Sequence, residues 1–282
     1  MIGYLYVLPA FLVFAVFVIA PMADGAWISL FQWDGVTAGH WVGLDNYRQA
    51  VSDPGVRQAF KHSVVLILFY SVLPITIGLV LTAALSHARI RGVVVVQTVI
   101  FLPQVLAAVV IGIAWKWLYD PLGPINQALG AVGLDSFERP WLGDFQTALP
   151  AIGVIGTWIT TGLCVVLFMA GIQRIPLSRY EAARVDGAGP VREFFAVTLP
   201  GLRNELAVAL SLTVITALRV FDIIYVTTKG GPGDETTVPS LVIYQRAFVT
   251  GQVGSAAAIG AIMGVIILAL AVGITRIVEE RG

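Results

Sequence analysis

The sequence predicts an all-α integral membrane protein with six spanning helices and a charged helix-turn-helix between the fourth and the fifth. The first observation is composition, because 57% of the residues are hydrophobic and only 12% are charged, whereas about a quarter of the residues of soluble domains are charged. The second is the length of the apolar stretches. A bilayer core about 30 Å thick needs roughly 20 apolar residues per helix, and stretches this long exclude β-barrel strands.

Six stretches meet this length requirement. They are residues 4–30, 60–85, 93–117, 149–172, 205–227 and 254–274. Almost no basic residue precedes the first stretch and no small-residue cleavage pattern follows it, so we interpret it as a retained span rather than a signal peptide. No other segment is long enough to bury a core of its own. We therefore expect a single membrane domain over residues 1–282.

The arginines mark one side of the membrane. They gather between the second and third stretches, between the fourth and fifth, and after the sixth: Arg89, Arg91, Arg174, Arg179, Arg184, Arg192, Arg203, Arg276 and Arg281. Cytoplasmic loops carry an excess of basic residues. We therefore expect a multi-pass protein with these segments and both termini in the cytoplasm.

The charged segment between the fourth and fifth stretches predicts two short helices. Ser178 and Glu181 have the spacing of a capping box that starts the first helix, and Gly187 can close it in a left-handed conformation. Gly189 and Pro190 then turn the chain into a second helix that ends near Leu199-Pro200. Its charges keep this hairpin out of the lipid. An ordinary solvated hairpin is the alternative interpretation.

The spacing Glu181-Ala182-Ala183, Gly187 and Leu199-Pro200 resembles the EAA loop of ABC-importer permeases, with Val197 in place of the usual isoleucine. Four further motifs resemble the carbohydrate-importer branch that includes the maltose and glycerol-phosphate permeases: WVGLDNY from Trp41, FLP from Phe101, WLGD from Trp141 and FDIIYVTTKGGP from Phe221. The resemblance covers almost the whole chain. It implies the type I ABC-importer permease fold and the plasma (inner) membrane of a prokaryote.

The resemblance also implies partners. In the family, the EAA helix of the segment 173–203 docks on a cytoplasmic ATPase, which here would involve Tyr180, Glu181, Ala182, Ala183, Asp186, Gly187, Leu199 and Pro200. Glu181 would then serve either its own helix cap or the ATPase. The expected assembly contains a second homologous permease, two ATPase subunits that bind ATP and magnesium, and an extracytoplasmic sugar-binding protein. This chain itself would bind no cofactor.

Polar side chains follow one face of two spanning helices. Thr157, Thr160, Thr161 and Cys164 share a face of the fourth, and Thr213, Thr216, Ala217 and Val220 share a face of the fifth. Such stripes serve helix packing in many membrane proteins. Matched to the maltose-type permease through the EAA and Leu-Pro motifs, the sugar-contacting positions fall on Ile159, Thr160, Leu163, Thr213 and Ala217. Trp158 offers an aromatic face for a sugar.

Other polar and aromatic residues favour structural roles. Arg219 and Asp222, three residues apart near the outer end of the fifth span, predict an ion pair that fixes helix packing. Trp115, Trp117 and Tyr119 suit an interfacial aromatic belt. The histidines His40, His62 and His87 are too scattered to indicate a metal centre, and the single cysteine excludes an internal disulfide.

These features predict a permease subunit of an ATP-driven, binding-protein-dependent carbohydrate importer that works by alternating access. The chain lacks the GxxxxGK[ST] phosphate loop and so is not expected to be an enzyme; we expect contacts with membrane lipid and none with nucleic acid. A membrane-embedded enzyme is one alternative, but of the ionisable residues only Asp24, Arg219 and Asp222 lie clearly within the spans. The remaining alternatives are an ion-driven secondary transporter and an ABC permease for a non-sugar solute.

Overall fold

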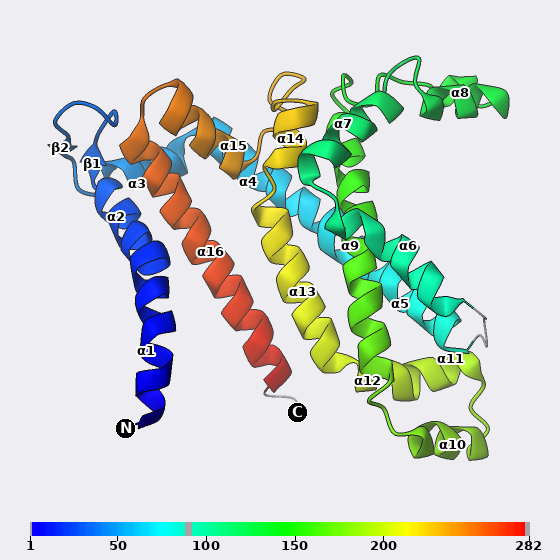
Figure 1. The fold of residues 1–282 in the computed structure, drawn as a ribbon. Coiled ribbons are helices and arrows are strands. Elements are labelled where there is room, and N and C mark those ends of the chain that lie inside the picture. The colour runs from blue at the N-terminus through cyan, green and yellow to red at the C-terminus, as the bar shows by residue number, and fades with distance from the viewer. Residues whose placement is uncertain (1, 88–91, 280–282) are drawn as a thin grey trace. The chain divides into compact units, whose positions relative to one another are not determined.

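The computed structural model describes residues 2–87 and 92–279, most of them in helices (Figure 1). Contacts divide the chain into two compact units. Unit 1 comprises Met1–Phe60 and Val238–Ile266, and unit 2 comprises Lys61–Thr237 and Ile267–Gly282. Helices α4 (Pro54–Ile67) and α16 (Val253–Glu279) each contribute to both units.

Unit 1 starts with a long apolar helix and continues into a small strand pair. The elements are α1 (Ile2–Phe14), the π-helical turn η1 (Ala15–Ile19), α2 (Ala20–Ile28), β1 (Phe31–Gln32), β2 (His40–Trp41), α3 (Asp45–Ser52), α15 (Pro239–Tyr244) and the π-helical turn η5 (Gln245–Val249). The two strands are antiparallel, with Phe31 opposite Trp41 and Gln32 opposite His40. Since each strand has two residues, side-chain contacts must hold the loop.

Asn46 ties this loop to the end of α2. Its amide Nδ2 donates to the carbonyl oxygens of Ser29 and Phe31, each at 2.8 Å, and its side chain is buried. The neighbouring Tyr47 hydroxyl lies 2.6 Å from the Ser29 hydroxyl. A helix end leaves its last carbonyl groups without partners, and Asn46 supplies a donor for one of them. This explains in structural terms why the WVGLDNY stretch has an asparagine followed by a tyrosine.

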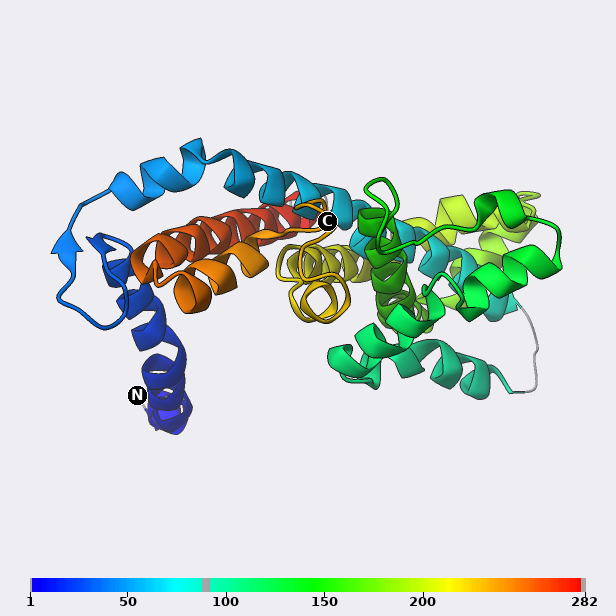
Figure 2. The ribbon, with the colours of Figure 1, turned by 90° about the horizontal axis from the view of Figure 1, so that it is seen from above.

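The core of unit 1 forms where α3 and α4 meet α15 and α16. Ala50, Val56, Ala59, Val242 and Ile259 are all nearly inaccessible to solvent. Figure 2 shows α15 and the first turns of α16 running alongside the start of α4. The small side chains from α3 and α4 allow the helices to approach closely.

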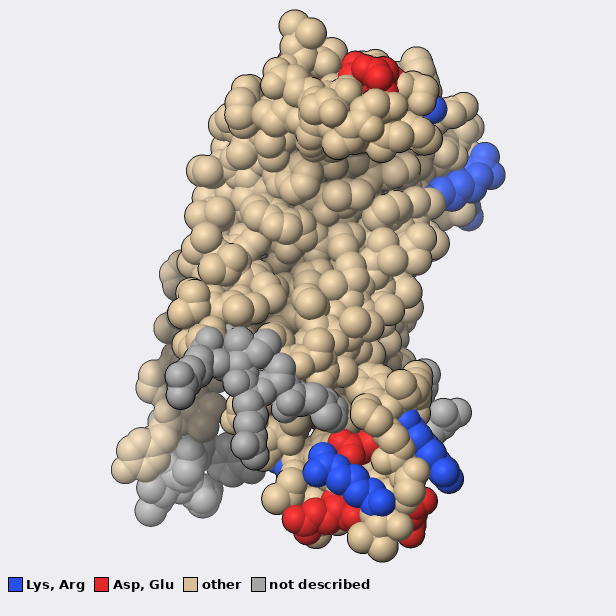
Figure 3. Space-filling view, turned by 90° about the vertical axis from the view of Figure 1, so that its right-hand side faces the viewer, with Lys and Arg blue, Asp and Glu red and all other residues tan. Residues whose placement is uncertain are grey.

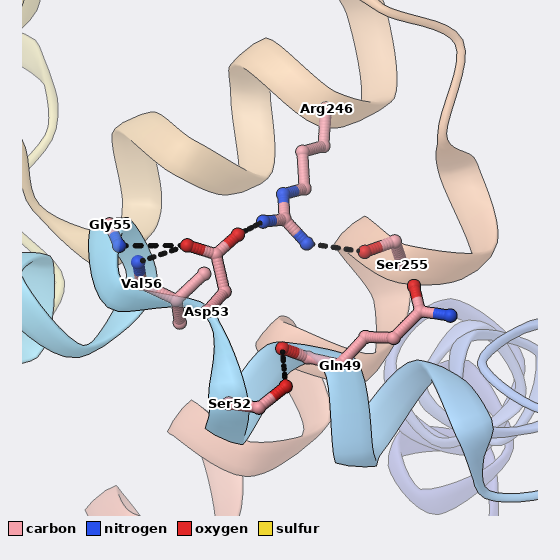
Figure 4. A network of polar contacts seen from close by, with 7 residues as sticks. All are labelled: Gln49, Ser52, Asp53, Gly55, Val56, Arg246 and Ser255. Carbon is pink, nitrogen blue, oxygen red and sulfur yellow. Dashed lines mark hydrogen bonds and ion pairs between the residues drawn. The ribbon is translucent and has the colours of Figure 1, made fainter.

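A polar network joins three elements of unit 1 (Figure 4). The Asp53 carboxylate accepts the amides of Gly55, at 2.7 Å, and Val56, at 3.3 Å, and so caps the start of α4. Arg246 in η5 donates to the same carboxylate and, at 2.6 Å, to the Ser255 hydroxyl in α16. Partial burial raises the pKa of Asp53, but these hydrogen bonds and the arginine charge outweigh burial and hold it below its ordinary value.

Unit 2 contains most of the spanning helices. Its elements after α4 are the π-helical turn η2 (Leu68–Val72), α5 (Leu73–His87), α6 (Val93–Val105), α7 (Ala108–Leu118), α8 (Pro124–Ala131), η3 (Asp135–Phe137), α9 (Ala148–Ile172), α10 (Leu177–Val185), α11 (Pro190–Glu193), η4 (Phe194–Thr198), α12 (Leu199–Gly201), α13 (Arg203–Leu218) and α14 (Asp222–Thr227).

Helix α9 is the centre of unit 2. It packs against α5 and α6 along its length and also touches η2 and α13, while α14 packs against α7. In Figure 1 the helices α7, α8 and α14 lie at one end of α9, and α10, α11 and α12 lie at the other. Cys164, Phe168, Leu202 and Ala209 form a fully buried cluster between α9 and the start of α13. The short helices α10 to α12 are therefore connected to a well-packed helix pair.

Among residues 2–87 and 92–279, five helices are long and apolar enough to cross a membrane: Tyr6–Ile28, Pro54–Leu85, Ala148–Ile172, Arg203–Thr227 and Val253–Arg276. The third predicted span is present but not as one helix. It is divided into α6 and α7, which meet at 99°. Leu106 and Ala107 are extended at the bend, three residues after Pro103, which lacks an amide proton and weakens the last turn of α6. Counted as one span, this bent pair brings the candidate spans among the described residues to six, the expected number.

Charged side chains lie at both ends of unit 2. Figure 3 shows one group at the lower end of the face in view and others at its upper end, with a broad uncharged band between them. Five of the arginines assigned to the cytoplasm, at positions 174, 179, 184, 192 and 203, lie in or beside α10 to α12. Arg89, Arg91 and Arg281 lie outside the described residues. The spanning helices thus belong to a multi-pass membrane protein whose charged residues lie at the ends of the helices of unit 2.

Asp53→Asn is expected to lower the free energy of unfolding by about 1 to 3 kcal/mol, because it weakens a charge-assisted hydrogen bond with Arg246. The folded pKa of Asp53 lies below its ordinary value of 3.8. The stabilisation is therefore complete above that value and is lost as the pH falls through the folded pKa. Thermal unfolding in detergent across this pH range should show the difference between wild type and variant shrinking in acid.

Asp45→Asn is the control for this experiment. Asp45 pairs with Arg48 at 3.0 Å, but the two side chains are 57% and 80% exposed, so the pair contributes little. An equal loss of stability in the two variants would contradict the role given to Asp53.

Candidate functional site

The charged hairpin, residues 173–203, begins with α10. The predicted capping box is wrong. The N-cap is Pro176, with extended backbone at φ −58° and ψ 134°, and no side chain caps the helix. Ser178 is already inside the helix, so its hydroxyl lies past the cap position. Glu181 is exposed. It does not cap its own helix, so that role does not compete with the expected contact to an ATPase.

The end of α10 is as predicted. Gly187 has a φ of +76°, and its amide donates to the Arg184 carbonyl at 3.0 Å. The Ala188 amide donates to the Ala183 carbonyl at 2.9 Å. These two bonds form a Schellman motif, which needs a residue that tolerates the left-handed region. Pro190 then starts α11, and the second limb of the hairpin runs to Gly201.

An ion pair closes the two limbs of the charged hairpin on each other. Arg184 Nε donates to Glu193 Oε2 at 2.8 Å, and Glu193 is only 3% exposed. The hydrogen bond from Arg184 and the charge of Glu193 raise the pKa of the arginine above its ordinary value. The hydroxyls of Tyr180 and Thr198 meet at 3.2 Å between the same limbs. The hairpin is thus held by polar contacts, because it buries little apolar surface.

The outward side of α10 has no partner within the described residues. Leu177 is 66% exposed and Val185 87% exposed, and Arg179, Glu181 and Ala182 are also exposed. Apolar side chains that stand open among charged ones are typical of a protein-binding surface. Tyr180 and Ala183 are only partly exposed.

The charged hairpin packs tightly on the helices that enter and leave it. A Cβ atom at Gly171, in the last turns of α9, would lie 2.5 Å from Leu202 Cδ2, and one at Gly201 would lie 2.5 Å from Ile175 Cδ1. At both distances a side chain would force Leu202 or Ile175 to shift. Glycine therefore allows the chain to enter and leave the hairpin in close contact.

The threonines of α9 bond to the π-helical turn η2. The Thr157 hydroxyl donates to the Phe69 carbonyl at 2.6 Å, and the Thr160 hydroxyl lies 3.0 Å from the Tyr70 carbonyl. A π-turn shifts the regular hydrogen-bond ladder, which leaves backbone groups available for such bonds. Gly156 makes the approach possible, since a Cβ atom there would lie 2.0 Å from the Tyr70 ring.

Helix α13 reaches the same turn through Thr213. Its hydroxyl lies 2.7 Å from the Ser71 hydroxyl and also 2.7 Å from the Ala209 carbonyl, and the residue is fully buried. Thr160 is 2% exposed. Both hydroxyls proposed for sugar contact are therefore engaged inside unit 2, which favours the helix-packing interpretation of the threonine stripes.

The other residues of the predicted sugar path are placed differently. Trp158 is 43% exposed and Thr216 is also exposed, Ile159 and Leu163 are partly exposed, and Ala217 and Val220 are buried. Of the whole set, Trp158 and Thr216 have the most accessible side chains. In the two threonine stripes, Thr160 and Thr213 thus serve helix packing, whereas Thr216 lies on an open surface.

The predicted ion pair of Arg219 and Asp222 is absent from the described part of the chain. Both side chains are exposed, and the helix is interrupted between them, because α13 ends at Leu218 and α14 begins at Asp222. The i, i+3 spacing brings side chains together only on a continuous helix. The prediction failed because the sequence does not show this interruption.

Aromatic rings form a chain from the C-terminal end of α7 to the N-terminal half of α9. The ring of Trp115 lies 5.7 Å from that of Trp158 and 5.1 Å from that of Tyr119, which in turn lies 6.2 Å from Trp141. A largely apolar pocket of about 410 Å³ borders Trp115, Tyr119 and Trp141. No cluster of metal-binding side chains occurs among the described residues.

The family model for the binding-protein-dependent transport system inner membrane component matches residues 74–281. The chain belongs to this family. It is 38% identical over 272 residues to the probable ABC transporter permease protein YurN of Bacillus subtilis, covering 95% of this chain and 93% of that protein. It is 34% identical over 276 residues to the trehalose/maltose transport system permease protein MalF of Thermococcus litoralis, covering 96% and 91%.

A solved structure shares the fold. The crystal structure of a bacterial ABC transporter that imports the acidic polysaccharide alginate contains a chain that matches with a TM-score of 0.84 at 22% identity, covering 99% of this chain and 95% of that one. Family membership confirms the predicted ABC permease and makes this chain a membrane component of a transporter rather than an enzyme.

Two features of the site were not predicted from the sequence. Neither the π-turn η2 nor the pairing of the exposed Arg184 with the buried Glu193 follows from the sequence, because the charges of the hairpin predict only that it stays out of the lipid. A signal for the first was present. Gly153 and Gly156, with Thr157 and Thr160, put glycine and threonine on one face of α9, a pattern typical of close helix contact in membranes.

Gly156→Ala is expected to destabilise the protein by roughly 1 to 3 kcal/mol or more, because the new Cβ has no space beside the Tyr70 ring. Gly273→Ala is the control, since nothing lies within 4 Å of a Cβ there. Thermal unfolding of purified protein should show a lower Tm for the first and an unchanged or higher Tm for the second. Equal Tm values would contradict the close contact of α9 with η2.

Proposed function

We propose that this chain is the membrane-spanning permease subunit of an ATP-driven, binding-protein-dependent importer of carbohydrates. Relatives support the substrate class. Besides the trehalose/maltose permease, the diacetylchitobiose uptake system permease protein NgcF of Streptomyces coelicolor is 31% identical over 273 residues, covering 92% of this chain and 77% of that protein. The proposed assembly adds a second homologous permease, two cytoplasmic ATPase subunits and an extracytoplasmic sugar-binding protein.

The observation that carries the proposal is the open face of α10 on a hairpin rigidly attached to α9 and α13. We propose that the ATPase binds this face, at Tyr180, Glu181, Ala182, Ala183, Asp186 and Gly187, with Leu199 and Pro200 supporting it from the second limb. The Arg184–Glu193 pair keeps α10 at a fixed position on the hairpin. Closure of the ATPases would then move α9 and α13 as one body and switch access to the path.

In this proposal the sugar passes along the accessible side of α9 and α13. Trp158 offers a ring face and Thr216 a hydroxyl on exposed positions. The partly exposed Ile159 and Leu163 shape the surface near them, and the buried Ala217 and Val220 support it from behind. Thr160 and Thr213 hold the two helices against η2. Few polar contacts suit a transporter, because tight binding would slow release.

The arginine-bearing hairpin sets the proposed orientation. It lies in the cytoplasm, with both termini on the same side of a prokaryotic plasma membrane, and the loop between α2 and α3 lies outside. ATP and magnesium bind to the ATPase subunits, and this chain binds no cofactor.

One specific observation favours a second candidate, an ABC permease for another small solute. The osmoprotective compounds uptake permease protein GgtC of Synechocystis is 30% identical over 246 residues, covering 85% of each chain.

The ATPase contact is tested by recovering this chain from native membranes and identifying the proteins that follow it. Ala182→Trp places a large ring on the exposed face of α10, and Gly187→Trp puts a side chain where φ is +76°. Both should lose an ATPase that co-purifies with the wild type. Ala196→Trp, exposed on the other limb of the same hairpin, should retain it. Equal recovery of the ATPase in all variants would refute α10 as the docking helix.

The energy source and the solute are tested by uptake into cells or vesicles. Import of a labelled disaccharide should stop when ATP is depleted and should continue when a protonophore collapses the ion gradients. Import that follows the ion gradient instead would support an ion-driven secondary transporter. ATP-dependent import of an osmoprotectant, without import of any saccharide, would favour the second candidate.

A further inference from the structure

A polar pocket of about 520 Å³ lies in unit 1, beside the end of the first spanning helix. Its size is within the range of small-molecule sites, about 300 to 1,000 Å³. The loop that joins β1 to β2, the first turns of α3 and the start of α16 form its walls. None of the proposed import path belongs to it.

The walls of the pocket are fixed by hydrogen bonds. The Asp34 carboxylate accepts the amides of Val36, at 2.9 Å, and Thr37, at 2.8 Å. The Trp33 indole donates to the Thr37 carbonyl at 2.7 Å, and the Gly254 amide donates to the Trp33 carbonyl at 3.2 Å. The Trp33 ring is therefore held in place in the wall of the pocket, and little conformational entropy would be lost when a ligand binds.

Several polar side chains of the pocket are free to bind a ligand. Gln32, His40, Gln49 and Gln252 are exposed, and no hydrogen bond among the described residues engages their side chains. Figure 4 shows the amide of Gln49 extended on the side of Ser255. Each glutamine amide offers both donors and an acceptor, and histidine can supply either.

The charge of the lining narrows the class of ligand. It contains the carboxylates of Asp34 and Asp45 but neither lysine nor arginine, which disfavours an anion. The described residues hold no metal-binding cluster. Amide groups that donate and accept, together with a fixed aromatic ring, match a molecule that carries many hydroxyl groups on an apolar ring.

We infer that this pocket binds one ring of an uncharged saccharide at the extracytoplasmic end of unit 1. Gln32, Gln49 and Gln252 bond to sugar hydroxyls, and Trp33 covers a ring face. The inference rests on the proposed import of carbohydrates and adds to it a second sugar contact, in a different unit from α9 and α13. Such a site would raise the local concentration of saccharide where it leaves the binding protein.

The test is direct binding to the assembled transporter in lipid nanodiscs without its sugar-binding protein. Maltose, trehalose and sucrose serve as uncharged probes and glucuronate as the charged one, with saturation-transfer NMR as the readout. An uncharged probe should bind, and the double variant Gln32→Leu, Gln49→Leu should weaken it at least tenfold. Gln252→Leu alone should weaken it as well and serves if the double variant does not fold. Gln245→Leu, in the same unit but outside the pocket, should bind normally.

Three results would overturn the inference. The first is that no uncharged probe binds to the wild type. The second is that the pocket variants bind the probe as well as the wild type does. The third is that the pocket variants bind sugar normally but their ATPase is no longer stimulated by the binding protein. The last result would make the pocket a protein-docking site. Uptake by the same wild-type preparation separates the proposed import of carbohydrates from the proposed sugar site. If the wild type imports sugar and the variants bind it unchanged, only the sugar site in the pocket is refuted.

Discussion

The arrangement of unit 2 depends on five residues of π-helix, Leu68–Val72, to which two other helices are bonded. In a membrane the hydrophobic effect does not hold helices together, so close packing and hydrogen bonds must. The wider turn frees backbone carbonyls, and Thr157 and Thr160 of α9 bond to them. Thr213 of α13 bonds to Ser71 in the same turn. Gly153 and Gly156 let α9 come close enough for these bonds to form.

This contact determines what the charged hairpin can do. The helices α9 and α13 are fixed at mid-length by η2 and at one end by the cluster of Cys164, Phe168, Leu202 and Ala209. The hairpin follows directly from that end, and its two limbs are joined by the buried Glu193 carboxylate. In the proposed coupling, a force on α10 reaches α9 through the turn at residues 173–176 and reaches α13 through the second limb. The proposed coupling to an ATPase needs this rigidity.

Much of this architecture could be predicted from the sequence, because it depends on composition and on local rules. The length of the apolar stretches predicts the spanning helices. The glycine at position 187, which tolerates a positive φ, predicts the end of α10. Other features depend on contacts that a single sequence does not show. Ser178 has the spacing of a cap, yet the N-cap is Pro176, two residues earlier than the capping box requires. The Arg219–Asp222 pair failed because a break in the helix separates residues that the spacing would bring together.

The candidate site was likewise predictable only in part. Threonine spacing correctly identified two special helix faces, but it did not separate hydroxyls that serve packing from those that meet a solute. Burial separates them, since Thr160 and Thr213 are closed off and Trp158 is open. The bend after Pro103 also required the structure, because a proline in a spanning helix is often tolerated.

The rigidity of unit 2 is tested most directly by the distance between spin labels at Ala196, on the second limb of the charged hairpin, and Asp222, at the start of α14. Both positions are exposed, and the buried Cys164 would be replaced by alanine. In the assembled transporter, pulsed electron paramagnetic resonance should give one distance distribution, the same without nucleotide and with bound ATP. A shift of several ångströms between the two states would show that the hairpin moves independently of α9 and α13, and would contradict the account.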